Sequence, residues 1–163
     1  MDTVYKLLQP HLSKIPQCFS SSGAVFAMLC LTMIAKFIHI GLSVVLLKSY
    51  DNVQARHRTE NIAETREKRM VNRAYNAHMN SWEAFAAFGI AVLLCLKNKG
   101  DSTELSTCCN AFIAIRVAYL QIYLMADNDI LAMVRSIAWG LGFGLILHIF
   151  IMGCGELSLS KLF

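Results

Sequence analysis

The strongest constraint on this chain is the run of residues 23–47, in which Lys36 is the only charged side chain. At about 1.5 Å per residue, a helix of this length crosses roughly 30 Å of hydrocarbon. Residues 106–125 and 130–152 form two similar runs, each with a single Arg, at positions 116 and 135. In a chain that is 56% hydrophobic and only 16% charged, these three segments predict transmembrane helices.

A fourth membrane-crossing helix is expected between the first and second of these runs. The apolar stretch 84–96 is too short to span alone, but residues 70–83 before it contain neither Pro nor Gly and can extend the helix. The sequence thus predicts an all-α, integral membrane four-helix bundle, with helices at about 22–48, 71–97, 105–126 and 130–153. Residues 1–163 are interpreted as one transmembrane domain. The first apolar run is too long for a signal peptide, so we expect it to be retained.

The basic residues predict the orientation of the helices. Eight Lys and Arg residues fall on the side of the first and third loops, seven of them between positions 48 and 73, against five on the side of the two termini. The positive-inside bias then places the first and third loops in the cytosol. The basic stretch 56–73 is interleaved with Glu residues, which favours a solvated segment near lipid headgroups over a nucleic-acid surface.

Polar residues of the predicted helices converge at this same cytosolic side of the membrane. Residues at spacings of three or four share one helix face, so each of the second and third helices presents a polar row. The candidates are Asn76, Asn80 and Glu83 on the second helix, Arg116, Tyr119 and Tyr123 on the third, and Arg135 and Ser136 at the start of the fourth. An arginine within a span needs a polar partner, and Glu83 is the expected partner of Arg116.

Each candidate also has a purely structural interpretation. The Glu83–Arg116 pair would serve equally well as an ion pair that fixes helix register, and the two tyrosines as packing residues. Arg135 lies where an arginine that extends its head to the membrane surface would also lie. The six cysteines have no metal-ligand spacing and are read as small apolar residues. Gly140, Gly142 and Gly144 predict a close approach of neighbouring helices, and Trp82 and Trp139 are interpreted as interfacial residues.

Three segments together resemble the membrane-associated proteins in eicosanoid and glutathione metabolism, the MAPEG family. NAHMNSWEAF at 76–85 is similar to its second-helix motif, RVAYLQIY at 116–123 to its third-helix motif, and RS at 135–136 to the start of its fourth helix. The resemblance extends in order and spacing over nearly the whole chain. The form of the second-helix motif is closer to the bacterial-type branch or a eukaryotic relative of it.

The resemblance implies a homotrimer in an internal membrane, such as the endoplasmic reticulum if the source is eukaryotic. In glutathione-using members the tripeptide sits between subunits near the cytosolic face. The positions carried over as glutathione-binding are Lys48, Asn80, Glu83, Arg116, Tyr119 and Tyr123. Those carried over as catalytic are Arg135, which would stabilise the thiolate, and Ser136, which could donate a hydrogen bond to it.

The expected function is that of a membrane-bound transferase or peroxidase that joins the glutathione thiolate to a lipophilic electrophile arriving from the membrane lipid. Several glutathione-using members have Arg where this chain has Asn76 and Met79, so the chain offers fewer cations to the ligand. That departure supports the alternative, a non-catalytic trimeric membrane protein of the same fold that binds lipid or protein partners.

Overall fold

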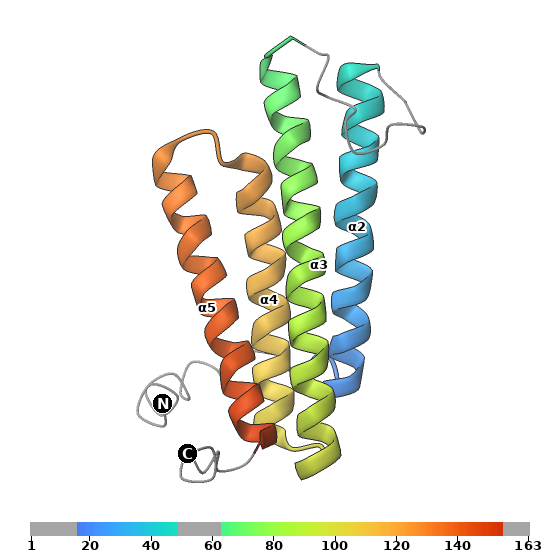
Figure 1. The fold of residues 1–163 in the computed structure, drawn as a ribbon, viewed down its shortest axis with the longest axis vertical. Coiled ribbons are helices and arrows are strands. Elements are labelled where there is room, and N and C mark those ends of the chain that lie inside the picture. The colour runs from blue at the N-terminus through green and yellow to red at the C-terminus, as the bar shows by residue number, and fades with distance from the viewer. Residues whose placement is uncertain (1–15, 49–62, 155–163) are drawn as a thin grey trace, which may run out of the picture.

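The computed structural model describes residues 16–48 and 63–154, and this part of the chain forms four helices (Figure 1). They are α2 (Ser21–Leu47), α3 (Arg66–Lys99), α4 (Thr103–Met125) and α5 (Asp129–Cys154). Each is long and apolar enough to cross a membrane, which confirms the predicted all-α class and the multi-pass membrane topology. The basic residues at positions 6, 14, 56, 58 and 161, which entered the prediction of orientation, lie outside the described residues.

Side-chain caps begin all four helices. The first backbone N–H groups of a helix lack intrahelical acceptors, and a Ser, Thr or Asn at the N-cap supplies one. Ser20, Thr65, Ser102 and Asn128 do so, accepting from the N–H three residues further along in each case. The observed bounds differ from the expected ones by at most two residues, except that α3 begins five residues early, because Thr65 caps it.

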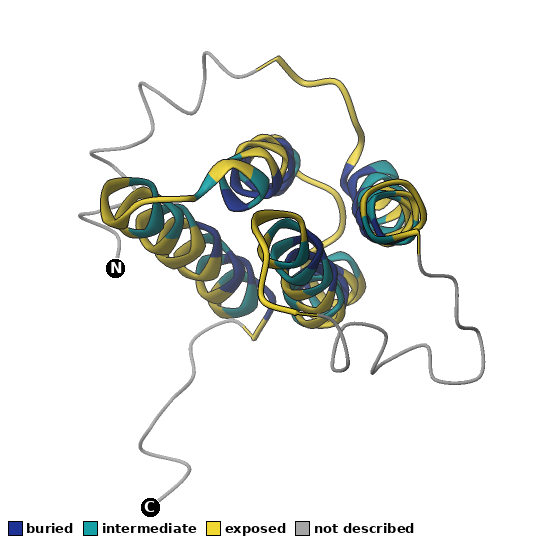
Figure 2. Ribbon diagram, turned by 90° about the horizontal axis from the view of Figure 1, so that it is seen from above, coloured by how far each residue is buried: buried dark blue, intermediate teal, exposed yellow. Residues whose placement is uncertain are grey.

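α3 is the central element of the bundle. Both α3 and α4 pack against each of the other three helices, with α3 in the more extensive contact with α2, whereas α2 makes no contact with α5 within the described residues. Figure 2 shows the buried residues on the sides of the helices that face one another. Toward the end where α3 and α5 finish, the core is apolar, with Met28, Phe88, Phe112 and Ile149 among its fully buried members.

A second, smaller core lies toward the other end of the bundle and contains Ala35, Ala77, Tyr119, Leu120 and Tyr123. Its tyrosines bring polar groups into the bundle at the end formed by the start of α3, the end of α4 and the start of α5. The end of α2 and the α4–α5 connection also lie at this end (Figure 1). These tyrosines thus add polar groups to the interior at this end, while a separate buried polar set, Ser21, Thr107 and Asn110, lies at the opposite end.

Among the described glycines, Gly153, near the end of α5, lies closest to another helix. A Cβ added there would lie 2.8 Å from the backbone nitrogen of Cys95 on α3, which leaves no room for a side chain. Gly140 and Gly144 have nothing within 4 Å of an added Cβ, and Gly142 has only ordinary contacts with side chains. The predicted close approach at these three glycines is therefore wrong within the subunit, because the helices meet at the opposite end of α5.

Candidate functional site

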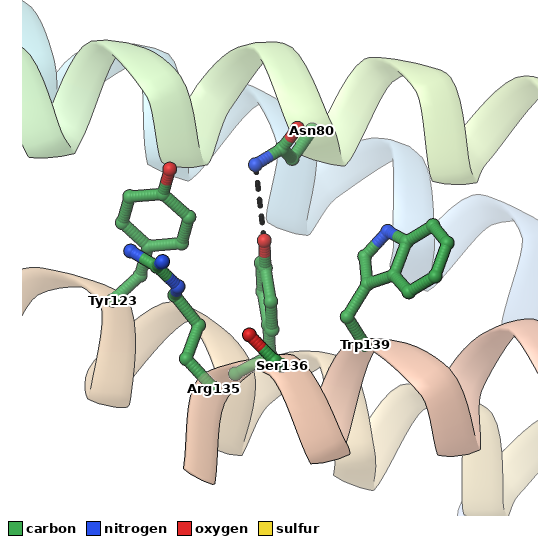
Figure 3. A pocket seen from close by; sticks show the side chains of 6 residues that line it. Asn80, Tyr123, Arg135, Ser136 and Trp139 are labelled. Carbon is green, nitrogen blue, oxygen red and sulfur yellow. Dashed lines mark hydrogen bonds between the residues drawn. The ribbon is translucent and has the colours of Figure 1, made fainter. Parts of the chain in front are cut away.

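A cavity of about 180 Å³ opens between α3, α4 and α5 at the end of the bundle that contains Tyr119 and Tyr123 (Figure 3). Its lining comes from one residue of α3, two of α4 and three of α5: Asn80, Tyr119, Tyr123, Arg135, Ser136 and Trp139. Five of these six are candidates named from the sequence. Residues separated by up to 59 positions in the chain are thus brought to one place by the up-and-down path of the helices.

Two arginines and two tyrosines form a continuous stack beside this cavity. The guanidinium carbon of Arg116 lies 4.3 Å from the ring centroid of Tyr119, and that of Arg135 lies 4.6 Å from the centroid of Tyr123. The two tyrosine rings meet edge-on with centroids 5.5 Å apart. Cation–π contacts of this kind favour a cation where water is scarce, so the stack holds positive charge near the cavity without a carboxylate.

Arg116 does not form the expected ion pair with Glu83. Among the described residues, the acceptors of its guanidinium are the Asn80 carbonyl at 3.1 Å and the Ser81 hydroxyl at 3.4 Å. Arg116 is only 3% exposed, whereas Glu83 is exposed. The prediction of a direct pair was wrong because the α3 backbone and Ser81 lie nearer to Arg116, and the Nε of the guanidinium has no protein partner.

Ser136 and Arg135 differ in detail from their expected roles. The Ser136 hydroxyl donates to the Ala132 carbonyl of the preceding turn at 3.1 Å, so its proton is directed at its own helix. Arg135 lies six residues after Asp129, in the second turn of α5 rather than the first. Because the field of a helix dipole falls off within the first turn, the positive charge near the cavity comes chiefly from the guanidinium itself.

A second cavity of about 160 Å³ adjoins the first and shares Asn80 and Trp139 with it. Glu83 and Arg116 line this one, together with apolar residues of all three helices. The carboxylate and guanidinium predicted to pair thus border a common space without touching. The polar residues that line the second cavity, Asn80, Glu83 and Arg116, lie nearer to the first cavity than its apolar lining residues on α3 and α4 do.

Lys48 is the one proposed binding residue that lies apart from both cavities. It ends α2 in a left-handed conformation with φ of 50° and is exposed. Because α2 makes no contact with α5 in the described part of the chain, nothing on α2 reaches the cavities from within the same subunit. Any contribution of Lys48 to this site has to come from a neighbouring copy of the chain.

Trp139 is the lining residue that the sequence analysis assigned to the membrane interface alone. It is four residues after Arg135, so the two share a face of α5, and this spacing was the available signal. Its ring also stacks on Phe143, one turn further on, with the planes 2° apart and centroids at 5.5 Å.

Four membrane-crossing helices with an arginine–tyrosine cavity at one end define a multi-pass membrane protein with a polar pocket near one membrane surface. The protein-family model described as MAPEG family matches residues 23–155, so the chain belongs to the MAPEG family. Comparison with curated proteins and with solved structures gives no match. The match includes every candidate site residue, from Lys48 to Ser136.

Proposed function

We propose that this protein is a membrane-bound, glutathione-dependent transferase or peroxidase that joins the glutathione thiolate to a lipophilic electrophile. The observation that carries the proposal is the first cavity, in which Arg135 and two tyrosines border a space open to a ligand. Membership of the MAPEG family supports glutathione as the co-substrate.

The chemistry requires a thiolate at neutral pH. A free thiol has a pKa near 8.5 and is mostly protonated, so a nearby cation is needed to favour the anion. In this site the Arg135 guanidinium supplies the permanent positive charge, and Tyr119 and Tyr123 supply hydroxyl groups that hold the peptide. The thiolate sulfur then donates an electron pair to an electrophilic carbon, and the pair it displaces either departs with a leaving group or moves from a π bond to the neighbouring atom, which takes up a proton. The Ser136 hydroxyl donates to the Ala132 carbonyl, so it would have to rotate away from that carbonyl to donate a hydrogen bond to the sulfur.

The proposed assembly is a homotrimer with the site at the contact between subunits. The first cavity has about 180 Å³ in one subunit, below the range of roughly 300–1,000 Å³ that small-molecule pockets usually occupy. Glu83 is exposed next to an apolar stretch of a membrane-crossing helix, where an uncovered carboxylate is costly. A second copy would cover Glu83, enlarge the pocket and bring its own α2, with Lys48, toward α5.

The decisive measurement is the binding of glutathione to the purified protein in mild detergent, by titration calorimetry. Saturable binding that is weakened at least about tenfold in the Arg135→Met variant supports the proposal. An absence of binding by a folded protein would favour the alternative, a non-catalytic trimeric membrane protein that binds lipid or protein partners. Asn76 and Met79, both exposed, favour that alternative, because they stand where several glutathione-using members have Arg.

The same preparation tests the assembly. Native mass spectrometry of the detergent complex should report three copies per particle. We also propose an internal membrane, such as the endoplasmic reticulum in a eukaryotic source, because the site as oriented draws glutathione from the cytosol.

A further inference from the structure

The second cavity lies deeper in the bundle than the proposed thiolate site. On α5 it is bordered by Gly142, Phe143 and Ile146, which follow Arg135 by seven to eleven residues, or roughly 10 to 17 Å along a helix axis. On α3 and α4 its apolar border is formed by Ala84, Ala87 and Phe112. Trp139 and Asn80 border both cavities, so a single elongated molecule can occupy the two at once.

Flat aromatic surfaces from two helices border this deeper cavity. On α4, Phe112 stacks on Phe88 with centroids 4.2 Å apart and planes at 16°, and both side chains are fully buried, which holds the Phe112 ring in place. On α5, Trp139 and Phe143, whose rings stack parallel to one another, also border this cavity. Offset stacking and edge contacts with such rings favour a planar group over a bulky aliphatic one.

The volume of the deeper cavity limits what it accepts. An engineered apolar cavity of about 150 Å³ in another protein stays dry and binds benzene, and the cavity here measures about 160 Å³. A group of about one six-membered ring is therefore matched to this volume, whereas a fused two-ring system would have to extend beyond it. Glu83 and Arg116 add polar groups to the border of this cavity, which separates it from a purely lipid-filled groove.

We infer that the deeper cavity holds a planar, apolar group of about one ring at the far end of the lipophilic electrophile, and that Gly142 sets its size. This inference rests on the proposed function, since the electrophile's reacting atom would then lie toward Arg135. An arylalkyl isothiocyanate has this form. The thiolate sulfur bonds to the central carbon of the N=C=S group, the C=N π pair moves to nitrogen, and nitrogen takes up a proton equivalent to the one lost by the thiol. No group leaves.

Gly142 offers a matched test of this size limit. A Cβ added there would lie 3.6 Å from a ring carbon of Phe112 and 3.8 Å from a methyl of Ile115, so Ala is accommodated while its methyl takes up cavity space. Gly144, two residues further along α5, has nothing within 4 Å of an added Cβ and does not border the cavity. Gly142→Ala and Gly144→Ala thus make the same change to the helix and differ in where the methyl lies.

Binding can be measured without glutathione or turnover. The chain has two tryptophans, so Trp82→Phe leaves Trp139 as the only one, at the border of both cavities. Nitrobenzene, a ring-sized quencher, should quench its fluorescence saturably, and 1-nitronaphthalene should bind more weakly. One added methylene in a hydrophobic pocket alters binding by about tenfold or more. Gly142→Ala should therefore weaken the binding of nitrobenzene by about tenfold, and Gly144→Ala should leave this binding unchanged.

A parallel assay of glutathione conjugation compares phenethyl, ethyl and naphthylethyl isothiocyanates, with the spontaneous rate subtracted. The phenethyl compound should have the highest kcat/KM, and Gly142→Ala should lower that value mainly through KM. Non-saturable quenching, equal effects of the two glycine variants, or equal binding of nitrobenzene and nitronaphthalene would each overturn the inference, because lipid or a second copy would then fill the cavity. If glutathione fails to bind while Gly142→Ala still weakens the saturable quenching, the inference about the ring-sized cavity is supported and the proposed function is contradicted.

Discussion

Asn80 on α3 donates its side-chain N–H to the phenol oxygen of Tyr119 on α4 at 3.0 Å. The Tyr119 oxygen therefore acts as an acceptor toward the protein, and its own O–H is left to donate elsewhere. Tyr119 borders the first cavity while only 2% exposed, so under the proposed function its O–H would donate to the ligand there. The pair makes Tyr119 a fixed hydrogen-bond donor in the candidate site.

Removing that hydroxyl should weaken glutathione binding without unfolding the bundle. In Tyr119→Phe the ring and its contacts with Arg116 and Tyr123 remain, but a buried donor to the ligand is lost. We expect binding to fall by about tenfold, roughly 1.4 kcal/mol, as measured by titration calorimetry. Tyr75→Phe, on the α2-facing side of α3, is the control and should bind normally.

Replacing Arg135 by Lys should separate anchoring at the membrane surface from stabilisation of the thiolate. Lys keeps the positive charge but loses the planar guanidinium that lies over Tyr123. Assembly should therefore be normal, while conjugation slows by at least about tenfold, or roughly 1.4 kcal/mol of transition-state stabilisation. The ultraviolet absorbance of the bound thiolate should fall in parallel. Unchanged rate and absorbance would leave Arg135 as an anchor only.

Substitutions of Arg116 and Glu83 should behave almost independently. Arg116→Met removes two hydrogen bonds inside the bundle, to the Asn80 carbonyl and to the Ser81 hydroxyl, and should cost about 1–3 kcal/mol of stability. Glu83→Gln alters an exposed side chain and should cost little. Thermal unfolding of both single variants and the double variant in detergent should give a coupling energy below about 0.5 kcal/mol. A larger coupling energy would show that Arg116 and Glu83 interact directly, as the sequence suggested.

Gly153→Ala should destabilise the bundle more than any alanine substitution at the other α5 glycines. The added methyl would meet the Cys95 backbone, which cannot yield as a flexible side chain could. Overpacking of this kind costs about 1–3 kcal/mol. Gly144→Ala, which has open space, should be neutral or slightly stabilising. Midpoints of thermal unfolding in one detergent compare the two directly, and equal midpoints would show that α5 can move away from α3.

The orientation prediction can be tested with an impermeant maleimide. Cys18 and Cys154, both exposed, lie at the end of the bundle opposite to the α4–α5 connection and should react only from the non-cytosolic side. With both replaced by Ser, Ala63→Cys in the first loop should react only from the cytosol. Thr59, in the same loop, lies outside the described residues, so Ala63 is the better position. Reaction from the reverse sides would place the candidate site in the other leaflet.

Much of this arrangement follows from patterns that lie within single helices. Spans are set by the length of apolar runs, and an antiparallel path fixes which ends meet, so the convergence of Asn80, Tyr119, Tyr123 and Arg135 could be predicted. The missing ion pair could not, because it depends on rotation of α3 by a fraction of a turn, which placed Ser81 rather than Glu83 next to Arg116. The spacing of polar residues predicts which face of a helix they share. It does not predict which acceptor on the neighbouring helix lies nearest to a given side chain.

The deeper cavity was missed for a related reason. Phe112, Gly142 and Phe143 are apolar residues in apolar spans, and nothing in their sequence separates residues that fill a core from residues that border a space. The glycines of α5 illustrate this, since sequence spacing favoured 140, 142 and 144 as contact points, whereas the backbone contact occurs at Gly153. Packing across three helices is a property of their relative tilt and offset.

The unequal lengths of α3 and α4 bear on the kind of bilayer that suits the protein. α3 has 34 residues and α4 has 23, which correspond to about 51 Å and 35 Å at 1.5 Å per residue. Glu104 near the start of α4 and Asp127 just after its end mark charged limits that resist entering hydrocarbon. α4 is therefore matched to a bilayer core of about 30 Å, and a thicker core would create hydrophobic mismatch at α4. Bilayer thickness thus acts on the helix that carries Arg116, Tyr119 and Tyr123.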